Sequence, residues 1–143
     1  MNREVHLVVE GSTEQTFVRE VLAPELAMSG IYITASQIGT PGHKGGNVCF
    51  KRAVNDIGDF LKQRRDIWVS TMLDYFRIDS LEQLREQQRT GIQLTAGQKA
   101  AILETATIQA LVIKLPAVNV AERFIPYFSM HEFEALLFSD AGI

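Results

Sequence analysis

The sequence lacks several features that mark particular protein classes. Its single cysteine, Cys49, can form neither an intramolecular disulfide nor a multi-cysteine zinc site, so nothing indicates an oxidising compartment. No apolar run approaches the roughly 18 residues that span a bilayer, and the short apolar stretch after residues 1–4 does not form a secretion signal. These absences predict a cytoplasmic protein with no membrane role.

Strong net charge and a nucleotide-hydrolysis motif are also absent. The net charge of −3 argues against a protein that grips nucleic acid over its whole surface, but it leaves room for a local basic strip. The loop at residues 39–46, GTPGHKGG, does not have the Gly-x4-Gly-Lys-Ser/Thr spacing of a phosphate-binding loop. We interpret it as a surface loop. In the functional alternative, Lys44, followed by Lys51 and Arg52, contacts a phosphate backbone.

Strand-like and helix-like hydrophobic patterns alternate along the chain. With 143 residues, of which 46% are hydrophobic, the sequence can bury the core of a single domain, 1–143. Short apolar runs predict a mostly parallel sheet of about four strands with helices on both faces, the α/β class. In chain order, the strands are expected at residues 5–9, 31–38 and 67–73 and within RFIPYFSM.

The predicted helices follow these strands. Ser12 is placed to cap the first helix with Gln15 in capping-box spacing, and Pro24 is expected to bend or restart it. A further amphipathic helix is expected from Phe50, and a helical segment with more apolar surface to bury is expected from Thr95 through Leu111. Two more helical segments are expected, a solvated one in SLEQLREQQR and one that opens at HEFEALLFSD.

Acidic residues stand where the predicted strands end. Glu10 follows the first strand and Asp74 closes the third. The carboxyl ends of parallel strands share one edge of a sheet, and the fourth strand would bring further polar residues to it. These are His131, Glu132 and Glu134. Carboxylates gathered in one crevice repel each other, so they must be protonated, paired or held by a divalent cation, and oxygen ligands suit Mg²⁺ or Mn²⁺.

Each of these residues also has a simpler structural interpretation. Glu14 can stabilise a helix N-terminus, Asp74 can bond a turn backbone, and His131 can cap or pack. Glu132 and Glu134 can be ordinary first-turn acids, and Arg123 can offset the repulsion within the acidic cluster. The aromatic residues are expected in the core: Trp68, Phe124, Tyr127 and Phe128.

Several segments together resemble a known family. The stretch VVEGSTEQTF and the strand-terminal Asp74 are similar to the two signature elements of the Toprim fold, found in topoisomerases, primases and nucleases of the overcoming-lysogenization-defect group. More closely, four blocks resemble domain-of-unknown-function family 4276, a bacterial Toprim-like family. The blocks are VEGSTEQTFVREVLAPEL, the glycines at 45–46, MLDYF at 72–76 and RFIPYFSMHEFEALLFSD at 123–140.

The resemblance implies metal-dependent phosphodiester chemistry. Glu10 matches the Toprim glutamate that serves as acid/base or metal ligand, and Asp74 matches the first aspartate of the DxD element. The expected metal ligands are Glu10, Glu14, Asp74, Glu132 and Glu134. The element here reads Asp74-Tyr75-Phe76, so its second aspartate is missing, and Asp79 is not assumed to replace it. Family members continue beyond the HEFE block, so we expect this chain to be either a fragment or an abbreviated member.

Three hypotheses follow. The first is a Mg²⁺-dependent Toprim-like nuclease or related phosphodiester-transfer enzyme, which by analogy acts beside a separately encoded ATPase in defence against mobile DNA. The second is a catalytically inactive Toprim-like partner subunit, which the missing second aspartate favours. The third is an α/β domain that binds a phosphorylated ligand at the same edge. Nucleic acid is the expected partner in the first case, and a homodimer is compatible with all three.

Overall fold

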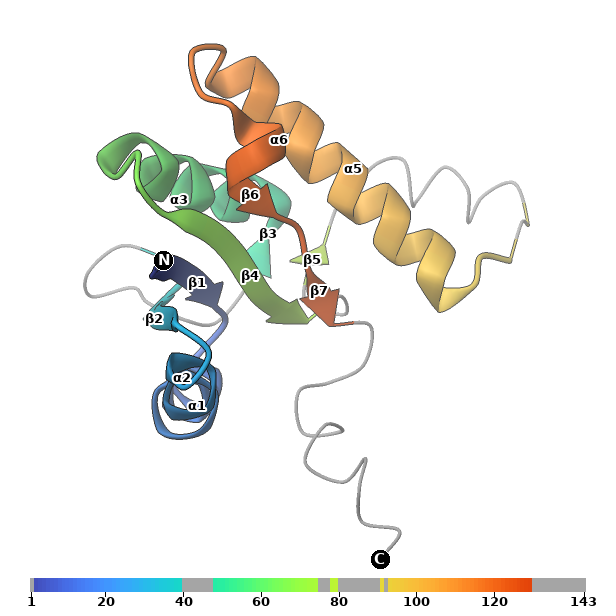
Figure 1. Cartoon of the computed structure of the whole chain (residues 1–143). Coiled ribbons are helices and arrows are strands. Elements are labelled where there is room, and N and C mark those ends of the chain that lie inside the picture. The colour runs from blue at the N-terminus through green and yellow to red at the C-terminus, as the bar shows by residue number, and fades with distance from the viewer. Residues whose placement is uncertain (1, 40–47, 75–77, 80–90, 92, 130–143) are drawn as a thin grey trace, which may run out of the picture.

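The protein is built around a parallel β-sheet. The computed structural model describes residues 2–39, 48–74, 78–79, 91 and 93–129 (Figure 1). The sheet has the order β2-β1-β4-β6, with β7 also paired to β4, and every pairing is parallel. Its strands are β1 (Arg3–Val9), β2 (Ile31–Gln37), β4 (Trp68–Asp74), β6 (Phe124–Ile125) and β7 (Phe128–Ser129). The predicted α/β class is confirmed, with five strands in this sheet.

Two further strands, β3 (Val48–Cys49) and β5 (Ile78–Asp79), form a separate parallel pair. Asp79 therefore lies in β5, where its backbone is paired with Cys49. Neither short strand was expected from the hydrophobic pattern, because two residues are too few to show a period.

Helices cover both faces of the sheet, as predicted. Figure 1 shows α1 (Ser12–Phe17) and α2 (Ala23–Ala27) on one side, and α3 (Phe50–Gln63), α5 (Ala96–Lys114) and α6 (Val120–Arg123) on the other. The alternation of side chains along β1 explains the two layers. Val8 belongs to the large core under α3 and α5, whereas Leu7 and Val9 pack with Val18 in a second, smaller core. Within the described residues, no helix is long and apolar enough to span a bilayer.

The first helix begins differently from the expectation. Its N-cap is Gly11, not Ser12, and Glu14 rather than Gln15 reaches back to the start of the helix. A π-helical segment, η1 (Val18–Leu22), connects α1 to α2, and the Ala23 N–H bonds the Val18 carbonyl. The α2 helix begins at Ala23 with Pro24 in its first turn, where a missing N–H costs least. Leu22 and Ala23 both keep right-handed helical backbone angles, so the expected bend or restart near Pro24 is only a change from π-helical to α-helical hydrogen bonding.

The α5 helix agrees closely with its sequence pattern. Thr95 is its N-cap, and its hydroxyl accepts from the Gln98 N–H while the Gln98 side chain bonds the Thr95 N–H. The helices expected in SLEQLREQQR and in HEFEALLFSD lie outside the described residues.

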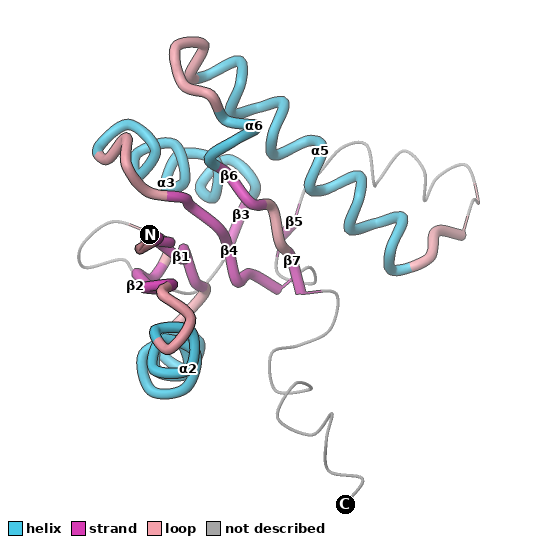
Figure 2. Tube along the Cα trace, viewed as in Figure 1, coloured by secondary structure: helices cyan, strands magenta, loops and turns pink. Residues whose placement is uncertain are grey.

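The last strand is split into two short pieces. Figure 2 shows a loop between β6 and β7, and Pro126 lies there because proline cannot donate to a ladder. Phe124 and Phe128 are buried in the core as expected. Tyr127 is 43% exposed, so its expected burial is wrong: it lies in the loop between β6 and β7 and not in a buried strand.

Candidate acidic site at the carboxyl edge of the sheet

Glu10 and Asp74 meet at the carboxyl edge of the central strands. Glu10 follows β1, Asp74 ends β4, and these strands are parallel neighbours. The Glu10 Oε2 atom accepts the backbone N–H of Asp74 at 3.3 Å, although the residues are 64 positions apart. The two side chains are only 5% and 6% exposed. Folding therefore places the Glu10 carboxyl group against the buried end of β4, where a charged group is costly unless other groups compensate for it.

Glu14 is also buried at this edge, but its contact is local. Its Oε2 atom accepts the Gly11 N–H at 3.0 Å, in the first turn of α1. This bond satisfies one of the unpaired N–H groups at a helix start and places negative charge at the positive end of the helix. The structural interpretation of Glu14 thus has a direct contact in its support.

The described acids do not by themselves form a complete cation cage. In the part of the chain that the structure describes, no three His, Cys, Asp or Glu residues are gathered closely enough to hold a metal ion. Three of the expected residues, His131, Glu132 and Glu134, lie outside the described residues. The structure therefore brings the Glu10 carboxyl group to the Asp74 backbone, and Glu14 lies in the first turn of the helix that follows Glu10.

Ser129 is a neighbour of this site that the sequence pattern did not reveal. It is paired with Asp74 in the β4–β7 ladder and is 6% exposed. Two hydroxyls of β4 hold the strand pieces in place: Ser70 Oγ donates to the Ile125 carbonyl at 2.7 Å, and Thr71 Oγ1 donates to the Tyr127 carbonyl. The sequence does contain a sign of these contacts. Ser70 and Thr71 are adjacent in an apolar strand, and buried hydroxyls need hydrogen-bond partners, so a neighbouring segment with free carbonyls could have been expected.

Two amide side chains tie α1 to the end of β2. Gln37 Nε2 donates to Gln15 Oε1 at 3.0 Å, and Gln15 Nε2 donates to the Ala35 carbonyl at 3.1 Å. Gln15 therefore joins helix to sheet instead of capping the helix. This connection steadies the turn that carries Glu10.

Two of the three basic residues expected to contact phosphate, Lys51 and Arg52, lie within the described chain. Lys51 is exposed and Arg52 is half-buried, both in the first turn of α3. The α3 helix is antiparallel to the strands. Its middle bonds the end of β2, through the Gly39 N–H and Asp56. The residue after its last turn, Arg64, pairs with Glu4 near the start of β1. Its first turn consequently lies toward the carboxyl ends of the strands. Lys44 lies outside the described residues.

Among the described residues, Arg123 bonds backbone carbonyls and not the acids Glu10 and Asp74, so it does not offset their charge as expected. It precedes β6, and its guanidinium donates to the carbonyls of Ile67 at 3.2 Å and Leu61 at 3.1 Å, and to that of Arg64. These carbonyls belong to the end of α3 and the start of β4. The sequence places Arg123 at the beginning of its strand, and parallel strands begin at the edge opposite the acids.

The comparisons with known proteins give one match. The model of the family described as a domain of unknown function, DUF4276, matches residues 9–143. No curated protein and no solved structure matches the chain. The matched region includes β2, β4, β6 and β7 but only the last residue of β1, Val9, and it contains both Glu10 and Asp74. The chain belongs to the DUF4276 family.

Proposed function

We propose that the protein is a Toprim-type enzyme that acts on phosphodiesters with Mg²⁺ or Mn²⁺. The single observation that supports this most directly is the contact between the Glu10 carboxylate and the Asp74 backbone at the carboxyl edge of the sheet. Open α/β sheets bind their ligands at this edge. Oxygen donors from two strand ends, in a site with little water, are the ligands that a hard divalent cation prefers.

The proposal gives each acid a role. Glu10 and Asp74 hold the cation, and Glu10 also serves as the acid or base. Glu132 and Glu134 are proposed as further ligands; the described chain ends at Ser129 beside Asp74, only three and five residues before them. A cation bound there would activate water and stabilise the leaving oxygen of a phosphodiester. We propose that Lys51 and Arg52, at the start of α3, attract the phosphate backbone of a nucleic acid.

A catalytically inactive subunit is the second candidate. The sequence Asp74-Tyr75-Phe76 supports it, because the second aspartate of the Toprim element is missing. Such a subunit would bind a separately encoded ATPase or a phosphorylated ligand at the same edge. In either case we propose a cytoplasmic protein with a role in defence against mobile DNA, by analogy with the overcoming-lysogenization-defect nucleases.

The metal site can be tested without an activity assay. Titration of Mg²⁺ and Mn²⁺, followed by calorimetry and thermal melting, should give saturable binding that Glu10→Gln and Asp74→Asn abolish. Glu25→Gln is the matched control, because Glu25 is an exposed acid of α2. Glu14→Gln distinguishes its two interpretations: loss of binding assigns a ligand, whereas a lower melting temperature alone assigns a helix cap.

Activity assays then separate the two candidates. Supercoiled and single-stranded DNA are incubated with the protein and each metal, and cleavage that the Glu10→Gln variant lacks supports the enzyme. Metal binding without cleavage supports the inactive subunit. Unchanged metal binding in both the Glu10 and the Asp74 variants would refute the proposed site.

A further inference from the structure

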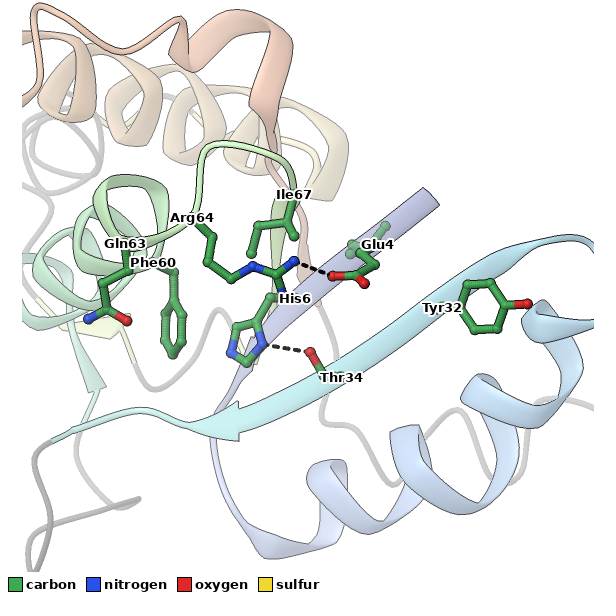
Figure 3. Close-up of a pocket in the computed structure, with 9 residues that line it drawn as sticks. Glu4, His6, Tyr32, Thr34, Phe60, Gln63, Arg64 and Ile67 are labelled. Atoms are coloured by element: carbon green, nitrogen blue, oxygen red, sulfur yellow. Dashed lines mark hydrogen bonds and ion pairs between the residues drawn. The ribbon is translucent and has the colours of Figure 1, made fainter. Parts of the chain in front are cut away.

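The side of the sheet toward α3 and α5 is covered from β6 to β1. The strands carry residues of the large core under these helices, and polar side chains continue the contacts at β1. Figure 3 shows His6 of β1 between Phe60 of α3 and Thr34 of β2, with Arg64 paired to Glu4. On this side, residues of the helical layer therefore contact the central strands across the sheet.

The other side of the sheet is covered only in part. Figure 1 shows α1 and α2 beside β2, and these helices pack mainly on that strand, together with η1. The small core on this side reaches β4 at Met72, which packs against Leu7, Val9 and Val18. Within the described residues, the helices of this side are therefore gathered over one half of the sheet.

Ile125 lies on the uncovered half. It follows Phe124, which belongs to the large core, so the alternation along a strand directs Ile125 to the other side of β6. Trp68 precedes the core residue Val69 in β4 and lies on the same side as Ile125. Ile125 is 49% exposed and Trp68 is half-buried. Parallel strands are normally covered on both faces, so this apolar face of β4 and β6 calls for an occupant.

The chain itself supplies a segment that fits this role. The described chain ends at Ser129 of β7, at the carboxyl edge of the sheet, and residues 130–143 follow it. The DUF4276 match extends through this segment, so it belongs to the same family domain as the sheet. Its sequence HEFEALLFSD places Phe133, Leu136 and Leu137 at the i, i+3 and i+4 spacing of one helical face.

The length of the segment agrees with the size of the face. Ten residues of helix are about 15 Å long. The strand from Asp74 back to Ser70, which is paired with Ile125, covers about 13 Å. A helix about 10 Å wide lies over two strands that are about 4.8 Å apart. A helix that starts after Ser129 and runs back along β4 and β6 therefore reaches Ile125.

We propose that residues 131–140 form a helix that packs its apolar side on this face of β4 and β6. Phe133, Leu136 and Leu137 then contact Ile125, and apolar surface on both sides leaves the water. A second copy of the chain is the alternative occupant. The segment is favoured because its attachment to β7 holds it at a high effective concentration beside the face. This packing goes beyond the proposed phosphodiester chemistry and does not depend on it.

Disulfide trapping in the full chain tests the contact. Cys49→Ser removes the single native cysteine, and Ile125→Cys with Leu137→Cys introduces the pair. Oxidation should link these two within one molecule, because a disulfide needs Cα atoms about 4.4–6.8 Å apart. Ile113→Cys with Leu137→Cys is the matched control and should not link, because Ile113 is exposed on α5, on the other side of the sheet. Mass spectrometry of peptides with and without reductant identifies the link.

Amide hydrogen exchange provides a second measurement. The amides of residues 131–140 should be protected in the full chain, and Ile125→Ser should speed their exchange at least about tenfold, as expected for the loss of a buried isoleucine contact. Ile113→Ser, the same substitution on the other side of the sheet, should leave their exchange unchanged. Ile125 is half-exposed in the described fold, so its serine variant is expected to fold, and protection of β1 and β4 checks this.

The outcomes are distinct from those of the metal-binding tests. Absence of protection at residues 131–140, protection that Ile125→Ser leaves unchanged, or equal linkage at Ile113 would overturn the proposal. Disulfide-linked dimers in place of linked monomers would assign the face to a second copy and would overturn it as well. None of these readouts changes if the protein binds no metal.

Discussion

Arg123 donates a hydrogen bond from Nε to the backbone carbonyl of Ile67 at 3.2 Å, across 56 positions of the sequence. With its other bonds to Leu61 and Arg64, the guanidinium links the start of β6 to the end of α3 and the start of β4. A planar fork can serve several carbonyls at once, which a single ammonium group cannot. Arg123 is therefore a structural residue of the edge opposite the acids.

Arg123→Lys should lower the free energy of unfolding by about 1–2 kcal/mol, because the part-buried carbonyls of Ile67 and Leu61 lose a charged donor. Urea denaturation measures this loss. Arg65→Lys, at an exposed arginine, should change stability little. Mg²⁺ affinity should be the same in the Arg123 variant as in the parent protein. A clear decrease in affinity would instead show that Arg123 acts at the acidic cluster.

Thr71→Val should reveal how the broken strand is held beside Asp74. Thr71 is 1% exposed, and its hydroxyl bonds the Tyr127 carbonyl near the interruption at Pro126. Replacing the hydroxyl by a methyl leaves that carbonyl without this donor, at a cost of about 1–2 kcal/mol. Chemical denaturation gives the value.

Thr107→Val is the matched control for this substitution. Thr107 is fully buried in α5, and its hydroxyl bonds the Leu103 carbonyl within the same helix, at 2.7 Å. Since that carbonyl belongs to the helical ladder, the loss should be smaller than at Thr71. Equal losses at the two positions would contradict a special role for the Thr71 bond.

Gly58→Ala should stabilise the protein. Gly58 is buried in α3 against α5, and an added Cβ would stand 3.6 Å from Leu115 Cδ1 and 3.7 Å from Leu111 Cδ2, which is ordinary van der Waals contact. Alanine favours the helix over glycine by about 0.8–1 kcal/mol, so the melting temperature should rise by a few degrees. Gly58→Leu should lower it, because the same space cannot hold a larger side chain. A lower melting temperature for the alanine variant would mean that the two helices are packed more tightly than these distances indicate.

Glu104→Gln should stabilise the protein at neutral pH and not in acid. Burial raises the pKa of the Glu104 carboxyl in α5. A raised pKa means that the charged form costs the folded state free energy above this pKa, and the cost disappears as the pH falls through it. Because the group is partly solvated, the gain from glutamine should stay below about 1 kcal/mol.

Melting curves of this variant and the parent protein should therefore separate at pH 7 and converge near pH 4, about the ordinary value for a glutamate. Glu122→Gln, at an exposed acid, is the control and should leave the melting temperature close to that of the parent protein. A constant difference at all pH values would show that titration of Glu104 is not its cause.

The hydrophobic pattern of the sequence was sufficient to locate the helices and strands whose apolar residues recur with a clear period. The long helices from Phe50 and Thr95 and the strands ending near Val9 and Asp74 were all predicted to within a few residues. Their class followed because apolar runs of strand length alternate with amphipathic helices. The same pattern put Glu10 and Asp74 at one edge, since parallel strands end on the same side of a sheet.

Features that depend on contacts between distant segments could not be predicted in this way. The sequence does not show that Arg123 faces the opposite edge from the acids, or that Ser129 pairs with Asp74. These contacts join segments more than 50 residues apart, so they depend on how the strands are arranged in the sheet. The contacts of the His6 ring with the Thr34 and Ser36 hydroxyls could not be predicted either, because they join two strands that pair across about thirty positions of the chain.

The amino-acid sequence alone determined the class of the fold, because local hydrophobic periods decide which segments become strands and helices. The tertiary structure alone decided which polar side chains meet, because hydrogen bonds and buried charges depend on distances of a few ångströms between segments remote in the chain.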